Sequence, residues 1–190
     1  MLLSLCATSG AAWAKDTSSI TQYPVTGKTA QEVYADIKAH APRVASNATF
    51  AFTMIATKTD KREMATAKNC KYSSFKPSAI YNFVVPMHSS PSALPAKTRG
   101  KWVNFVVYLK AHEAVHRSFW QKCLSDYDIE ALTLVEKTCA VLDAEREKLF
   151  TSFKRSCLAQ DEAFDVKFRK DVLKEPFLAE ALRTRPEQSR

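Results

Sequence analysis

Residues 101–120 read KWVNFVVYLKAHEAVHRSFW, and the pattern of this stretch determines the main element of the predicted fold. Large apolar residues recur at intervals of three and four, which is the period of one face of an α-helix. The stripe on this face comprises Trp102, Phe105, Val106, Leu109, His112, Glu113, His116, Phe119 and Trp120. Two histidines and a glutamate therefore point toward the core, which is the protected position that the ligands of a metal ion need.

The pentapeptide His112-Glu113-Ala114-Val115-His116 carries the clearest chemical signal in the chain. Histidines four residues apart lie on one helix face, so both imidazoles can reach a single metal ion. A glutamate beside the first histidine is the usual general base of a zinc-dependent peptidase, where it takes a proton from a water molecule. The alternative is a pair of core-edge histidines with a coincidental acid between them. The spacing on an amphipathic helix favours the metal site.

The rest of the sequence predicts an α+β fold, in which a small antiparallel β-sheet and one N-terminal helix precede long C-terminal helices that carry the motif. Only three glycines are present, which also favours long helices. Strands are predicted over 20–26, 47–57, 62–72 and 78–86, with a charged turn at 58–61. Helices are predicted over 29–40, from 101 to about 120, over 127–153 and over 159–173, with a loop at 88–100. The helix over 127–153 is expected to bury Ile129, Leu132, Val135, Val141, Leu142 and Leu149.

A third metal ligand has to come from outside the motif. A catalytic zinc normally has three protein ligands, and no histidine follows His116, so a carboxylate is expected. Asp165 is the favoured residue because the apolar residues Phe164 and Val166 flank it, which predicts a partly buried position. The other acids that we weighed, most of which should be solvated, are Asp161, Glu162, Asp171, Glu130, Glu136 and Asp143.

The remaining histidines and the two tryptophans near the motif have simpler interpretations. His40 and His88 are predicted to be ordinary surface residues. Trp102 and Trp120 lie on the inward stripe, so core packing is expected for both rather than contact with a substrate.

The N-terminus and the cysteines predict an exported protein, periplasmic or extracellular. Residues 1–14 form an apolar run that ends in a cleavage site of the Ala-x-Ala type, so a signal peptide is expected there. A single domain over 15–182 and a disordered tail over 183–190 should follow. The mature chain has four cysteines, which are Cys70, Cys123, Cys139 and Cys157. Two disulfides are expected among them, and three pairings are possible. A zinc bound by cysteines is less favoured because no C-x-x-C spacing occurs.

The formal net charge of +8 raises the question of a nucleic-acid partner. Lysine and arginine are spread along the chain and alternate with acids in its C-terminal half, and no nucleic-acid module is recognisable. We therefore expect a solvated basic surface that favours anionic envelope components or acidic substrates. No stretch approaches the length of a membrane-spanning helix, so a transmembrane protein is not expected.

Several short motifs resemble a bacterial family that is described as predicted secreted zinc-dependent proteases and is otherwise a domain of unknown function. Residues 23–29 resemble its opening Y-x-V-x-G-x-T, and residues 48–49 and 94–95 resemble its first long strand and its pre-helix loop. The spacing of Trp102 to the H-E-x-x-H motif is similar, and residues 139–142 resemble its Cys-x-x-Leu. The resemblance implies a zincin-like metallopeptidase with Zn²⁺ as its cofactor.

The chain departs from this family at the C-terminal signature Y-D-x-x-T-x-H-G, whose histidine resembles a third zinc ligand. Phe164 and Asp165 stand at the Y-D positions, but Lys170 replaces the histidine and Asp171 the glycine. Two consequences remain open: Asp165 or Asp171 serves as the ligand instead, or the catalytic zinc has been lost.

Three functional hypotheses follow. The first is a secreted or periplasmic zinc-dependent metallohydrolase, a peptidase that acts on peptide or protein substrates, with His112, His116 and Asp165 as metal ligands and Glu113 as the catalytic base. The second is a catalytically inactive envelope protein on the same scaffold that binds a partner or an anionic polymer. The third is a structural zinc that two histidines hold and that only stiffens the helix.

Overall fold

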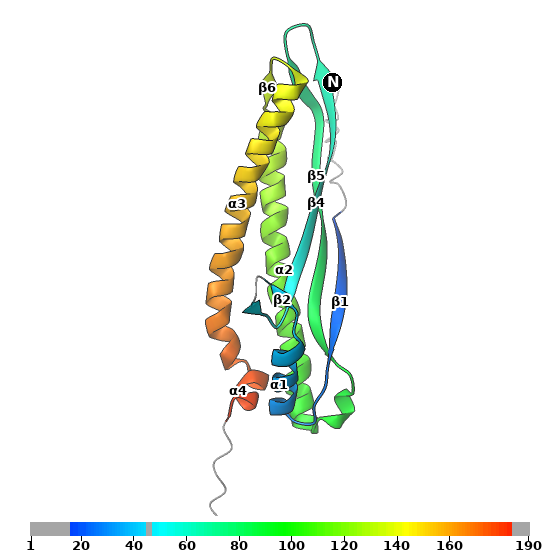
Figure 1. Ribbon diagram of the computed structural model, residues 1–190, viewed down its shortest axis with the longest axis vertical. Helices are drawn as coiled ribbons and strands as arrows, with labels where there is room; N and C mark the ends of the chain where they lie inside the picture. The colour runs from blue at the N-terminus through cyan, green and yellow to red at the C-terminus, as the bar shows by residue number, and fades with distance from the viewer. Residues whose placement is uncertain (1–15, 45–46, 184–190) are drawn as a thin grey trace, which may run out of the picture.

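Two long helices and a twisted β-sheet run side by side along an elongated molecule (Figure 1). The computed structural model describes residues 16–44 and 47–183. The main elements are β1 (Thr17–Val25), α1 (Ala30–His40), β4 (Phe52–Ala65), β5 (Cys70–His88), α2 (Ala96–Ala131), α3 (Cys139–Asp171) and α4 (Pro176–Ala181). Short strands β2 (Arg43–Val44), β3 (Asn47–Ala48) and β6 (Val135–Glu136) accompany them. Helix α2 lies between the sheet and α3, and the predicted α+β class is confirmed.

The predicted signal peptide over 1–14 and the predicted tail from residue 184 onward lie outside the described residues. Within the part of the chain that the structure describes, no helix is long and apolar enough to cross a membrane.

The sheet is mixed, whereas the sequence predicts an antiparallel one. Strand order is β1-β5-β4; β4 runs antiparallel to β5, but β1 pairs with β5 in parallel, from Thr17 opposite Ile80 to Val25 opposite His88. A parallel pair needs a long crossover, which α1 and β4 together supply. Alternation along a strand shows which face is buried but carries no information about the direction of the partner strand. The sequence pattern therefore could not reveal that β1 pairs with β5 in parallel.

The hairpin between β4 and β5 turns later than predicted. The charged residues 58–61 lie inside β4, and the turn is formed by residues 66–69, where the amide of Thr66 donates to the carbonyl of Asn69 at 2.7 Å. The hydroxyl of Thr66 in turn accepts from the amides of Lys68 and Asn69. Charged residues are tolerated within this strand because most of its distal half is exposed.

The helix boundaries after the motif are also corrected. Helix α2 continues to Ala131, and α3 is one helix from Cys139 to Asp171, so the predicted helices over 127–153 and 159–173 do not exist as separate elements. The predicted buried stripe fails for the same reason, because it crosses the break between α2 and α3. Of its members Leu142 is fully buried, whereas Ile129, Leu132, Val135 and Val141 are exposed. The missed signal is Thr138, which caps α3 by accepting from the amide of Val141.

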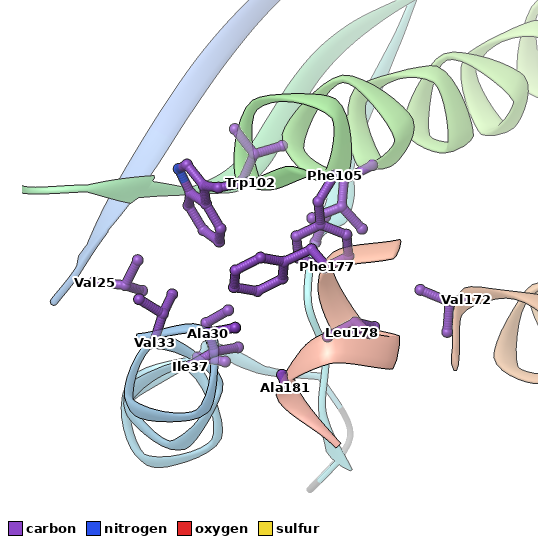
Figure 2. Packing of buried hydrophobic residues seen from close by; sticks show 14 of the residues in the cluster. Val25, Ala30, Val33, Ile37, Trp102, Phe105, Val172, Phe177, Leu178 and Ala181 are labelled. Atoms are coloured by element: carbon purple, nitrogen blue, oxygen red, sulfur yellow. The ribbon is translucent and has the colours of Figure 1, made fainter. Parts of the chain in front are cut away.

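Buried apolar residues form two clusters, one toward each end of α2. In the first, Phe177 of α4 points toward Trp102 and Phe105 of α2 (Figure 2), with ring centroids 5.1 Å and 5.4 Å apart. The second surrounds Trp120 and Tyr127 and includes residues of β5 and α3. The two tryptophans are therefore core residues, as predicted. The motif residues at 112–116 lie along α2 between these clusters.

Both predicted disulfides are present. Cys70 pairs with Cys139, which ties the start of β5 to the start of α3, and Cys123 pairs with Cys157, which ties α2 to α3. Cys70, Cys123 and Cys157 are buried, and Cys139 is half-buried. Helix α3 is therefore tied covalently to both β5 and α2.

The turn between β1 and α1 requires a glycine. Gly27 has a φ of +144°, and a Cβ at this position would lie 2.6 Å from the backbone nitrogen of Val33. We expect Gly27→Ala to lower the free energy of unfolding by about 1–3 kcal/mol because both the conformation and the backbone contact oppose a side chain. Chemical denaturation measures the change.

Gly100 is the matched control for this prediction. It lies inside α2, and a Cβ there would meet nothing within 4 Å. Gly100→Ala should therefore stabilise the protein by about 0.5–1 kcal/mol. Equal effects of the two substitutions would contradict the steric explanation for Gly27.

Candidate metal centre

Helix α2 presents the two motif histidines side by side. His112 and His116 are 7% and 8% exposed, and their Nε2 atoms lie 3.0 Å apart. This proximity follows from the i, i+4 spacing, which stacks side chains on one helix face. The rings are nearly perpendicular, with centroids 4.7 Å apart, and their Nε2 atoms meet at one point.

Helix α3 adds Asp165 at the same point. Its Oδ1 atom lies 3.0 Å from Nε2 of His112 and 3.0 Å from Nε2 of His116. The three atoms thus form a triangle with sides of 3.0 Å, close enough together for all three to bind one ion at the usual zinc distance of about 2.0–2.2 Å. Two imidazole nitrogens and a carboxylate oxygen are also a donor set that zinc accepts. The residues fit the metal that the sequence predicts.

An outer layer of hydrogen bonds orients His116. Its Nδ1 donates to Oδ1 of Asp161 at 3.0 Å, and Nε1 of Trp120 donates to the other oxygen of Asp161 at 2.7 Å. A carboxylate on Nδ1 fixes the tautomer that leaves the Nε2 lone pair free for a metal. Asp161 is therefore placed to orient a candidate ligand rather than to be one itself.

Aromatic rings hold His112 instead. Its imidazole stacks on Phe164 with centroids 4.6 Å apart and lies against Phe168 at 3.7 Å. Both rings come from α3 and flank Asp165 in sequence. Nδ1 of His112 is buried without a hydrogen-bond partner among the described residues, so aromatic packing and the contact of Nε2 with Asp165 set the orientation of this ring.

Glu113 lines the same cavity as the two histidines and is only 2% exposed. The hydroxyl of Thr53, on β4, donates to its Oε2 at 2.7 Å. Burial raises the pKa of the Glu113 carboxyl, and the hydrogen bond from Thr53 and the nearby histidines oppose this rise only in part. A buried carboxylate with a raised pKa can take up and return a proton.

The charges around the triangle favour a cation. Burial disfavours a charged His116, but the hydrogen bonds to Asp161 and Asp165 outweigh it and raise the pKa of this imidazole to about 10 in the metal-free protein. Burial likewise disfavours the charged form of Asp165, yet the two histidines outweigh it and lower the pKa of its carboxyl. The site therefore attracts positive charge, which a bound metal ion would supply in place of the proton.

A cavity of about 770 Å³ opens onto these residues. Its floor is formed by His112, Glu113 and His116 of α2. One wall is the segment 49–55 at the start of β4, and the other is the C-terminal part of α3 and the turn after it, over 161–173. Much of the lining is apolar, from Phe50, Phe52, Ile55, Phe168, Val172 and Leu173.

The structure brings together all three candidate ligands that the sequence favours. Of the other acids that were weighed, Asp161 contacts Nδ1 of His116 and Glu162 lines the same cavity. Asp171 pairs with Lys174 on the surface, and Asp143 pairs with Lys61 and accepts from the hydroxyl of Tyr72. Thr53 was not predicted, because its only sequence signal is a hydroxyl within an expected strand.

The prediction for His88 is wrong, whereas His40 is exposed as expected. His88 ends β5 and is 4% exposed; its Nε2 donates to the carbonyl of Gly27 at 2.9 Å and its Nδ1 accepts from the amide of Ser90 at 3.0 Å. Its ring also packs against Trp102. This histidine closes the turn after β1 and lies apart from the metal centre.

The fold and the site define an α+β protein in which helices α2 and α3 together carry a candidate His–His–Asp metal centre. Residues 20–170 match the family described as bacterial protein of unknown function (DUF922), and because the match covers most of the chain, the protein belongs to this family. No curated protein and no solved structure matches the chain. The family description states no activity, so any statement about activity has to come from the site.

Proposed function

We propose that the protein is an exported zinc-dependent metallohydrolase, a peptidase that hydrolyses peptide or protein substrates. The observation that carries the proposal is the triangle of His112, His116 and Asp165 donor atoms, 3.0 Å on each side, with the buried carboxylate of Glu113 next to it in the sequence and on the same cavity. Two disulfides and a bacterial family are compatible with export.

In this mechanism each residue has a defined task. His112, His116 and Asp165 would hold the ion, and Asp161 would keep the His116 ring in its binding tautomer. Zinc bound there would act as a Lewis acid that acidifies water and polarises a carbonyl group. Glu113 takes a proton from the attacking water and delivers it to the amine nitrogen as the C–N bond breaks. The burial of Glu113 suits both steps, because it raises the pKa of the carboxyl.

The cavity supports a peptide with a large apolar side chain as the substrate. Phe168 packs against His112, and Val172, Leu173 and Phe50 contribute further apolar surface to the same cavity. Burial of one large apolar side chain there contributes roughly 1.5–3 kcal/mol to binding. We therefore propose cleavage next to residues such as leucine or phenylalanine.

A second function is favoured by one observation. In the metal-free protein, His116 lies between Asp161 and Asp165, and its raised pKa of about 10 makes the three groups a complete ion-pair network. Such a network could stiffen the contact between α2 and α3 without any metal. The protein would then be a non-catalytic envelope protein that binds a partner or an anionic polymer.

Metal content separates the two functions. We expect the mature chain, purified without chelators, to contain one zinc per chain, to lose it to EDTA and to regain it on dialysis against zinc. Inductively coupled plasma mass spectrometry gives the stoichiometry, and a mixture-based peptide library gives the cleavage preference. Zinc content near zero after reconstitution would favour the second function and exclude the peptidase.

A further inference from the structure

The carboxylate of Glu113 has one hydrogen-bond partner among the described residues, and that partner belongs to a different element. Thr53 lies on β4, 60 residues away in the sequence, and its hydroxyl donates to Oε2 at 2.7 Å. The same carboxylate leaves Oε1 without a partner among the described residues, and both side chains line the cavity. Within residues 16–44 and 47–183, Oε2 is therefore held and Oε1 has no hydrogen-bond partner.

We propose that Thr53 is a positioning residue that holds Glu113 in the orientation required of the base. The proposal rests on the proposed function, since it assigns a task to a residue that touches the base rather than the metal. Because Oε2 is occupied by the Thr53 hydroxyl, Oε1 is the oxygen that accepts the proton of the attacking water and later gives it to the leaving amine.

The strand makes Thr53 a stiff support. Thr53 lies opposite Phe83 in the β4–β5 ladder, so its backbone is fixed by the sheet. Its β-branched side chain has few accessible rotamers, and the hydroxyl therefore points in a defined direction. A hydrogen bond from a neutral donor to a buried carboxylate is among the stronger ones in proteins, which is enough to select one carboxylate orientation.

A purely structural role is the competing explanation. A buried carboxylate needs at least one donor, and Thr53 would supply it whatever Glu113 does. The two explanations differ in what happens when the hydroxyl is removed from a protein that stays folded. Only the positioning role predicts that the carboxylate turns and that turnover falls while substrate binding and metal binding do not.

The test uses Thr53→Val, which is nearly isosteric but lacks the hydroxyl, and Thr53→Ser, which keeps it, in the zinc-reconstituted mature chain. Crystal structures should show the Glu113 carboxylate turned away in Thr53→Val and unchanged in Thr53→Ser. Zinc stoichiometry should be the same in both. On the best peptide from the library, kcat should fall about 10- to 100-fold for Thr53→Val at unchanged KM and stay within about threefold for Thr53→Ser.

Two comparisons make the result decisive. Adding Thr53→Val to Glu113→Gln should cause no further loss of turnover, because the two residues act through one step. The proposal is overturned if the Glu113 carboxylate stays in place in Thr53→Val and kcat remains within about threefold of wild type. It is also overturned if Thr53→Val lowers kcat further when it is added to Glu113→Gln. Should Thr53→Val fail to fold, Thr53→Ala against Thr53→Ser decides by the same criteria. If the proposed function fails, the wild-type protein will bind no zinc or cleave no peptide. In that case the orientation of the Glu113 carboxylate in the crystal structures still decides the role of Thr53.

Discussion

Glu113→Gln is expected to abolish hydrolysis while zinc binding stays at the wild-type level. The amide of glutamine has nearly the shape of the carboxylate and can still accept from Thr53, so the packing around residue 113 is preserved. It cannot accept a proton, however, and loss of a general base costs about 10²- to 10⁴-fold in rate. Because His112 and His116 are untouched, the metal ligands remain.

The stability of this variant should not fall. Burial raises the pKa of the Glu113 carboxyl, which means that the fold disfavours its charge, and glutamine removes that charge. Zinc content, melting temperature and hydrolysis rate are measured on the same preparation. Glu162→Gln is the matched control, since Glu162 also lines the cavity but is exposed and pairs with Arg169. Full activity in Glu113→Gln would exclude this residue as the base.

Asp165→Asn is expected to remove the zinc from a protein that remains folded. The carboxylate provides the third corner of the donor triangle, and a neutral amide is a poor substitute as a zinc ligand. Affinity should fall by more than about 100-fold, since loss of an outer partner of a ligand alone costs about 10- to 100-fold. Competition with a chromophoric chelator measures this affinity, and circular dichroism checks the fold.

The same substitution at two neighbouring acids gives zinc affinities with which the affinity of Asp165→Asn can be compared. Asp161→Asn should give the smaller, outer-partner loss of about 10- to 100-fold, because it removes the acceptor of His116 Nδ1 but no ligand. Asp171→Asn should have no effect, since its carboxylate pairs with Lys174 on the surface. If Asp171→Asn removed the zinc and Asp165→Asn did not, the assignment of the third ligand would be wrong.

The sequence predicts local features of this protein well, because they depend on spacing along one element. The helical period across 101–120 places His112, Glu113 and His116 on the buried face of α2, as observed. Asp165 could be selected because the apolar residues beside it indicate a half-buried position on a helix. The number of disulfides follows from the expectation of an exported chain, which retains four of the five cysteines after the predicted signal peptide is removed.

The features that the sequence misses depend on contacts between distant elements. The parallel pairing of β1, the pairing of Cys123 with Cys157 and the hydrogen bond from Thr53 to Glu113 all join segments that no spacing relates. The break between α2 and α3 is a different case. Apolar residues continue at helical intervals across it, and the capping residue Thr138 is a weaker signal than that period.

The bond between Cys123 and Cys157 lies about two helical turns from the candidate metal centre along both helices. Cys123 is seven residues beyond His116 on α2, and Cys157 is eight residues before Asp165 on α3. Closing this bond restricts how far the two halves of the donor set can separate, so less entropy is lost when an ion is captured. For the proposed enzyme we therefore expect oxidation to come first and tight metal loading second. The reduced chain should bind zinc more weakly than the oxidised chain and hydrolyse peptides more slowly.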